Sequence, residues 1–122
     1  LDPHASLTRA FGIPAEPPPP GTLDLFESPP KAVADVSRAT PIAHLRLLPA
    51  QAGMATLERR SATAPGLGLA LGQGLAAAAA DYDYALLDCP PTLGLLMVNA
   101  LAAADQLVVP TQTEPLGVHG ME

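Results

Sequence analysis

The chain has 122 residues, with twelve acidic side chains against six basic ones and a formal net charge of −6 at neutral pH. This balance disfavours a nucleic-acid-binding face within the segment, because such a face needs a basic surface. No apolar stretch of about twenty residues is free of proline and polar breaks, which excludes a membrane span, and one cysteine excludes an internal disulfide and fits a reducing cytoplasm.

The amino-terminal part of the sequence predicts a short helix and then a proline-rich loop. Residues 2–12 are typical of a strand end that enters a helix, with Ser6 or Thr8 able to cap it. Residues 13–21 are rich in proline and predict an extended, solvated loop. A spacer loop is favoured there over a docking motif for proline-binding domains.

The middle of the chain predicts short helices around one strand. Helical turns are expected over residues 22–26 and again within 31–38, where prolines bound them. Residues 42–49 predict a strand, with Leu45, Leu47 and Leu48 as its inner residues. Two further helices are expected, over residues 51–60, with Met54 and Leu57 on one face, and from about Leu69 to Tyr82, where an alanine run favours helix.

The segment 83–91 is the most informative part of the sequence. A short apolar run ends at Asp88 and stops at Pro90 and Pro91. Such a run is typical of a strand buried on both faces of a parallel sheet. An aspartate at its carboxyl end lies at the edge where open α/β sheets bind ligands, and there it can hold a hydrated Mg²⁺ on a nucleotide phosphate. A plain turn-capping aspartate is the alternative.

The residues after Pro91 predict a helix and another strand. Thr92 is the expected N-cap of a mostly buried helix that runs to Ala104. Residues 106–110 then predict an inner strand that ends at a proline. Strand, helix and strand within about thirty residues form a βαβ unit. Within the helix, Asn99 is expected to satisfy a backbone group rather than to take part in chemistry.

Three segments carry a family resemblance. Residues 81–122 resemble the ParA branch of the ParA/MinD ATPases, whose pattern is D-[Y/F]-x-x-[I/L]-D-x-P-P followed by a helix with Asn-Ala-Leu and a strand ending in Pro. Residues 1–12 resemble the family's D-x-D-P-Q switch segment, and residues 45–50 resemble the strand that enters P-[A/S]-x. The three matches occur in the family order.

The resemblance implies an α/β fold of the P-loop NTPase type, a doubly wound and mostly parallel sheet with helices on both faces. The family's loop K-G-G-x-G-K-[T/S] has no counterpart here, and the glycines of residues 66–72 lack the lysine that should follow. Residues 1–122 are therefore expected to be an internal fragment, a partial domain, of a single ParA-like nucleotide-binding domain.

The resemblance also implies roles for particular residues. Asp88 is expected to hold Mg²⁺ through water, and Pro90 and Pro91 to stiffen the nucleotide-binding loop beside it. Asp2 is expected to be catalytic, since the family's aspartate at this place is thought to position the attacking water. His4 stands where the family has glutamine. ATP and Mg²⁺ are the expected cofactors of the intact parent, with binding by the fragment itself in doubt.

The implied function is an ATP-binding and ATP-hydrolysing switch of the cytoplasm that positions or segregates DNA or a protein cargo. The resemblance implies a homodimer, with DNA or a ParB-like or cargo-adaptor protein as partner. Positioning of a chemotaxis or flagellar assembly and a non-enzymatic, truncated interaction module are the alternatives. An iron–sulfur relative is disfavoured, because its cluster needs two cysteines per subunit and only Cys89 is present.

Overall fold

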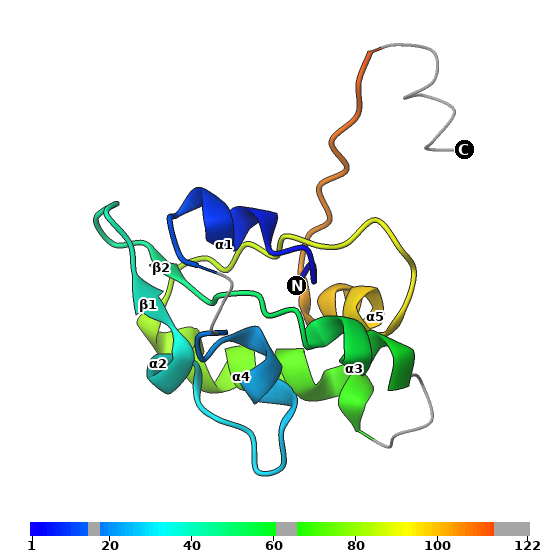
Figure 1. Cartoon of the computed structure of the whole chain (residues 1–122), viewed down its shortest axis with the longest axis horizontal. Coiled ribbons are helices and arrows are strands. Elements are labelled where there is room, and N and C mark those ends of the chain that lie inside the picture. The colour runs from blue at the N-terminus through cyan, green and yellow to red at the C-terminus, as the bar shows by residue number, and fades with distance from the viewer. Residues whose placement is uncertain (15–17, 61–65, 114–122) are drawn as a thin grey trace.

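The computed structural model describes residues 1–14, 18–60 and 66–113 of the chain (Figure 1). The part of the chain that it describes is mainly helical. The α-helices are α1 (Ser6–Ala10), α2 (Val33–Val36), α3 (Met54–Arg60), α4 (Ala70–Ala78) and α5 (Leu95–Ala103). The 3₁₀ helices are η1 (Thr22–Phe26), η2 (Leu67–Leu69) and η3 (Ala79–Asp81), and the strands are β1 (Arg38–Ala39) and β2 (Arg46–Leu47).

The predicted helices are confirmed, although several of their boundaries and caps differ from the prediction. Met54 and Leu57 share the buried face of α3, as their spacing predicted. Neither Ser6 nor Thr8 caps α1, because Ala5 occupies the N-cap position and Thr8 is buried, where its Oγ1 accepts a hydrogen bond from the Ala50 amide at 2.8 Å. The last helix begins at Leu95 rather than after Thr92.

Only a small part of a sheet is formed by the described residues, and the predicted mostly parallel order is not seen in it. Their sheet has two strands, in which β1 and β2 pair antiparallel with Arg38 opposite Leu47. Of the three leucines expected to face inward, Leu47 is buried but Leu45 is 39% exposed. Of the strand predicted over residues 42–49, only Arg46–Leu47 pair with another strand. Among the described residues their partner is β1, which lies shortly before them in the chain.

Two more predicted strands do not form ladders. Residues 83–88 and 106–110 carry no strand assignment, and within the described residues no backbone lies in register to pair with them. Their apolar side chains are correspondingly open, with Leu86 93% and Val108 82% exposed. An apolar run favours burial of its side chains, but a β-ladder also needs a second backbone within hydrogen-bonding reach.

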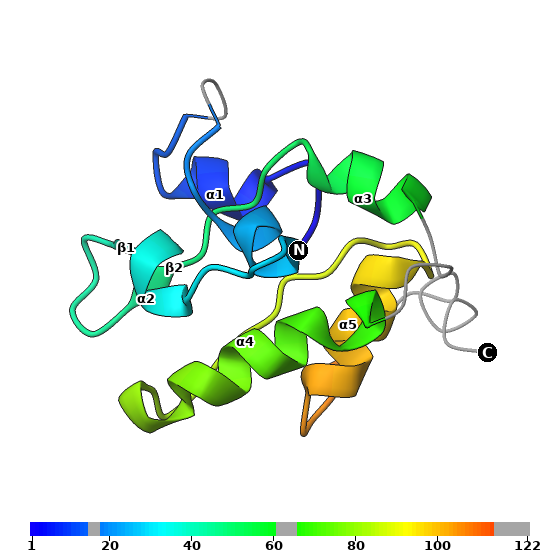
Figure 2. The ribbon, with the colours of Figure 1, turned by 90° about the horizontal axis from the view of Figure 1, so that it is seen from below.

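The helices nevertheless lie on two sides of extended chain. In Figure 2, α1 and α3 lie on one side, α4 and α5 lie on the other, and the yellow segment that joins α4 to α5 runs between them. Residues 104–113 lead away from the body as an extended chain (Figure 1). Two helical layers around an extended middle layer are the arrangement of an α/β fold.

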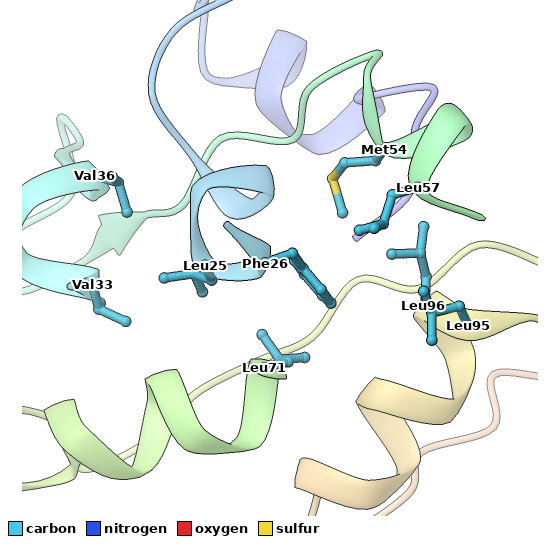
Figure 3. Packing of buried hydrophobic residues seen from close by; sticks show 9 residues of the cluster. All are labelled: Leu25, Phe26, Val33, Val36, Met54, Leu57, Leu71, Leu95 and Leu96. Carbon is cyan, nitrogen blue, oxygen red and sulfur yellow. The ribbon is translucent and has the colours of Figure 1, made fainter. Parts of the chain in front are cut away.

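One apolar cluster joins the helices (Figure 3). Nine buried side chains form it: Leu25, Phe26, Val33, Val36, Met54, Leu57, Leu71, Leu95 and Leu96. They come from η1 and all the α-helices except α1. Complete burial of one such side chain stabilises the fold by about 1.5–3 kcal/mol, so this cluster fixes α3, α4 and α5 relative to one another.

A buried asparagine adds a polar link between α4 and α5. The Asn99 side chain is 0% exposed, and its Oδ1 accepts a hydrogen bond from the Leu71 amide at 3.2 Å. Its Nδ2 donates to the Leu95 carbonyl at 2.9 Å. The prediction that Asn99 satisfies backbone groups is confirmed. Among the described residues, no helix has the length and apolar character needed to cross a membrane.

Candidate functional site

Asp88 ends the extended segment between α4 and α5, and its side chain is exposed. Within the described residues the Asp88 carboxylate accepts no hydrogen bond and forms no ion pair, so it is open to solvent and to a ligand. Its carbonyl oxygen is engaged instead, because it accepts a hydrogen bond from the Leu1 amino nitrogen at 2.9 Å. That bond spans 87 positions of the sequence.

The Leu1–Asp88 contact brings the two predicted site segments together. Asp2 follows the donor of that bond directly, so both acidic residues lie at the same end of the structure. The fold thus brings the segments of Asp2 and Asp88 together although they are far apart in the sequence.

Asp2 is held in a tight turn that leads into α1. Its Oδ1 accepts hydrogen bonds from the His4 backbone amide at 3.0 Å and lies 2.9 Å from His4 Nδ1. These His4 contacts, the backbone bond foremost, hold the pKa of the Asp2 carboxyl below its ordinary value. The turn closes through the Ala5 amide, which donates to the Asp2 carbonyl at 3.0 Å, and Ala5 has a φ of 56°, a conformation that disfavours side chains.

His4 contacts Asp2 through both its backbone amide and its ring. Its side chain is 80% exposed, whereas that of Asp2 is 20% exposed. The contact of His4 with Asp2 was not predicted from the sequence. The signal was present in the spacing, because an aspartate commonly accepts a hydrogen bond from the backbone two residues on.

The loop after Asp88 is anchored by one of its two prolines. Pro90 is buried and Pro91 is exposed, so the pair stops the extended segment with one ring packed inside. Cys89 is partly buried, and its Sγ donates to the Leu87 carbonyl at 3.4 Å. Burial raises the pKa of the Cys89 thiol, which keeps it protonated and a poor ligand for metal at neutral pH.

Glu58 contacts the start of the helix that follows Asp88, and the sequence did not reveal this contact. Thr92, the predicted N-cap of α5, is exposed, and no side chain of the flanking segment caps this helix. Glu58 Oε2 on α3 instead accepts a hydrogen bond from the Leu96 amide at 2.8 Å. A cap contributed 38 residues away leaves no local signal.

The donor set fits a magnesium ion held mainly by nucleotide phosphate and water. The described residues contain no cluster of three or more histidine, cysteine, aspartate or glutamate side chains that could enclose a metal ion. Mg²⁺ does not require such a cage, since it keeps several waters and is bound by one or two carboxylates together with substrate phosphates. The open Asp88 carboxylate, with Asp2 at the same end of the structure, matches that requirement.

A protein-family model described as an AAA domain matches residues 1–122. The chain belongs to this family and, within it, to the ParA/MinD P-loop ATPases. Two curated relatives place this ParA/MinD chain near the partition proteins. The chain is 31% identical over 121 residues to the sporulation initiation inhibitor protein Soj of Bacillus subtilis. The aligned region covers 99% of this chain and 47% of Soj. The chain is 31% identical over 91 residues to the chromosome partitioning protein ParA of Myxococcus xanthus, covering 75% of this chain and 32% of that protein.

Solved structures share the backbone arrangement of this ParA/MinD chain. The apo McdA structure from Cyanothece matches with a TM-score of 0.85 at 26% identity, over 98% of this chain and 47% of McdA. A cobyrinic acid a,c-diamide synthase from Mycobacterium smegmatis with bound ADP and magnesium matches with a TM-score of 0.73 at 30% identity, over 84% and 41% of the two chains. These matches support an α/β NTPase fold. The chain spans less than half the length of each of these relatives.

Proposed function

We propose that these residues form part of a ParA-like switch protein that binds Mg-ATP, hydrolyses it and uses the cycle to position DNA or a protein cargo. The observation that carries the proposal is the contact between Leu1 and Asp88, which brings the predicted catalytic and metal-binding segments to one end of the fold. The family match over residues 1–122 supports the same reading.

Asp88 holds a magnesium ion through water in this proposal, and its open carboxylate suits that task. Bound Mg-ATP supplies the triphosphate that is cleaved and the metal that neutralises its charge. Pro90 and Pro91 fix the path of the chain beside the nucleotide. Asp2 orients the attacking water, and its depressed pKa keeps it ionised and able to accept a hydrogen bond at neutral pH.

Residues 1–122 are proposed to be one part of a single nucleotide-binding domain. A groove of about 740 Å³ lies between the β1–β2 hairpin and residues 81–86, and Ile42, Tyr84 and Leu86 line it. Tyr84 is 88% and Ile42 56% exposed. In this proposal, a neighbouring strand from the rest of the domain covers the exposed apolar side chains on both walls of the groove. The phosphate-binding loop is then contributed by the rest of that domain.

The cargo and the partners are proposed only as classes. The similarity to Soj and ParA supports partition of DNA with a ParB-like adaptor, whereas the similarity to McdA supports positioning of a protein assembly. A homodimer sandwiching nucleotide serves either cargo. A non-enzymatic interaction module differs from both, because it binds no nucleotide.

Equilibrium binding of ATP with and without Mg²⁺, in the complete protein that carries these residues, tests the proposal. The wild type is expected to bind Mg-ATP, and Asp88→Ala to lose the magnesium-dependent part of the affinity. Asp2→Ala is expected to retain binding and to lose about 10²–10⁴-fold in hydrolysis rate, the range of a positioning or acid–base group. A folded wild type without affinity for Mg-ATP would overturn the proposal.

Asp105→Ala is the matched control for these variants. Asp105 is an exposed aspartate beyond the end of α5. Its removal takes away the same charge and is expected to leave nucleotide binding and hydrolysis as in the wild type. Equal losses in Asp88→Ala and Asp105→Ala would show that the net charge, rather than the site, matters.

A further inference from the structure

Both carboxylate oxygens of Glu58 meet the start of α5. Oε2 accepts the Leu96 amide at 2.8 Å, and a Cβ at position 94 would overlap Oε1. Gly94 has a φ of −153°, which any residue adopts, so a larger residue there would be opposed by the closeness of the Glu58 carboxylate, which would have to shift, and not by backbone conformation. A carboxylate at a helix N-terminus also interacts favourably with the helix dipole.

The two helices joined by this contact are both packed into the apolar cluster. On α3, the neighbours of Glu58 on the inner face are Met54 and Leu57, which are 0% and 7% exposed. On α5, Leu96 is 0% exposed, and Figure 3 shows it beside Leu57 in the apolar cluster. A hydrogen bond between two packed helices transmits position, because neither end can move without disturbing the core.

The segment between this contact and the metal-binding residue is short. We define residues 88–94 as the Asp88 loop. Asp88 is held by the Leu1 bond and Pro90 by burial, but Pro91, Thr92 and Leu93 are exposed and form no hydrogen bond within the described part of the chain. The carboxyl end of the Asp88 loop is held at the start of α5, where the Gly94 carbonyl accepts the Val98 amide at 3.0 Å and Glu58 accepts the Leu96 amide at 2.8 Å.

We propose that Glu58 is a positioning residue that fixes the Asp88 loop from α3, so that the Asp88 carboxylate is presented to the magnesium ion of bound nucleotide. This inference rests on the proposed function, since it concerns the same site. Groups that orient a metal ligand from outside its direct contacts are typically worth 10–100-fold in metal affinity. Glu58 acts through the backbone of the loop and touches neither metal nor nucleotide.

The test measures ATP affinity with Mg²⁺ and with EDTA in the complete protein. Glu58→Ala is expected to weaken the Mg-ATP complex about tenfold and to leave metal-free ATP binding unchanged. Glu58→Gln keeps an acceptor oxygen and is expected to restore most of the affinity. Glu27→Ala, which removes an exposed glutamate at the end of η1, is the matched control and is expected to bind as the wild type does.

Gly94→Ala tests the contact from its other side and serves even if Glu58→Ala does not fold. The added Cβ is expected to displace Glu58 and cause the same magnesium-specific loss. In the Glu58→Ala background it should cost nothing more, because residues that act through one contact are not additive.

The outcomes separate the two proposals. A wild type that does not bind Mg-ATP contradicts the proposed function. A wild type that binds, together with a folded Glu58→Ala that binds equally well, contradicts only the role of Glu58. Equal losses of ATP affinity with Mg²⁺ and with EDTA would also contradict the role of Glu58, because they indicate general destabilisation. Additive losses from Glu58→Ala and Gly94→Ala would contradict it for the same reason.

Discussion

Asp24 shows at the scale of one residue how this fold handles a buried charge. Its carboxylate accepts hydrogen bonds from Lys31 Nζ at 2.6 Å, the Gly21 amide at 2.7 Å and Gln51 Nε2 at 3.3 Å. Burial by itself would raise the pKa of Asp24, but these hydrogen bonds outweigh it and hold the pKa below the ordinary value. They also tie the end of the proline-rich loop to the chain before α3.

The Asp24→Asn variant is expected to lower the free energy of unfolding by about 1–3 kcal/mol near neutral pH, because it removes charge-assisted hydrogen bonds and offers Lys31 an amide. A depressed pKa contributes stability that is present above the ordinary aspartate value, near 4, and is lost as pH falls through the lower folded value. The difference between wild type and variant should therefore shrink below about pH 4.

Denaturant titrations at several pH values measure this difference. Asp35→Asn is the matched control, because Asp35 is an exposed aspartate on α2 and its replacement is expected to change stability by no more than about 0.5 kcal/mol. A wild-type advantage over Asp24→Asn that grew on acidification would contradict the assigned direction.

At the scale of elements, polar groups distant in sequence fix how the helices meet. Asn99 links α5 to the start of α4, and Glu58 links α3 to the start of α5. Thr22 Oγ1 donates to the buried Pro49 carbonyl at 3.1 Å and so joins η1 to the segment before α3. The Asn99 and Glu58 links each satisfy a backbone amide that a helix start would otherwise leave unpaired.

Replacement of Asn99 tests one of these links. Asn99→Ala is expected to lower the free energy of unfolding by about 1–3 kcal/mol, because the Leu71 amide is left buried without a partner. Urea denaturation followed by circular dichroism measures the loss. Gln73→Ala on the exposed side of α4 is the control, and equal stability of the Asn99→Ala and Gln73→Ala proteins would show that the α4–α5 link carries no stability.

At the scale of the whole molecule, the balance between packed helices and bare extended chain determines behaviour. The helical cluster supplies a core, whereas residues 83–88 and 106–110 expose apolar side chains with no ladder to cover them within the described residues. Extended chain of this kind pairs readily with other chains. We therefore expect the 122-residue chain to be marginally stable and prone to association.

Charged substitutions on the exposed apolar side chains test that expectation. Leu86→Lys together with Val108→Lys is expected to reduce association of the 122-residue chain, as measured by light scattering. Because both side chains are open to solvent, stability should change by no more than about 0.5 kcal/mol per site. Val33→Lys, at a buried position of α2, is the contrasting variant and should unfold the chain. Unchanged association in the double variant would contradict the assignment of these edges.

The 122-residue chain by itself is expected to show no ATP hydrolysis above background and at best weak nucleotide affinity. Asp88 and Asp2 are the proposed metal-binding and water-positioning carboxylates, but the sequence holds no phosphate-binding glycine-lysine loop. A phosphate-release assay checks this expectation. Turnover by the purified chain that Asp88→Ala abolishes would contradict it.

The sequence by itself determined the family and the positions of the helices. Local signals are sufficient for these features, because apolar periodicity, proline boundaries and the Asp88-Cys89-Pro90-Pro91 motif are all contained in short stretches. The same stretches placed Asp2 and Asp88 as candidates for one site. Their roles in catalysis and metal binding stay predictions.

Only the tertiary structure decided which contacts the candidates make. The Leu1–Asp88 bond, the His4 contacts of Asp2 and the Glu58 cap of α5 join groups by geometry that composition does not record. The same holds for the predicted strands. An apolar run specifies a preference for burial, whereas strand pairing depends on a second backbone being within reach. The sequence specifies the local structure that each segment favours, whereas the tertiary fold determines which neighbouring segment it pairs or packs with.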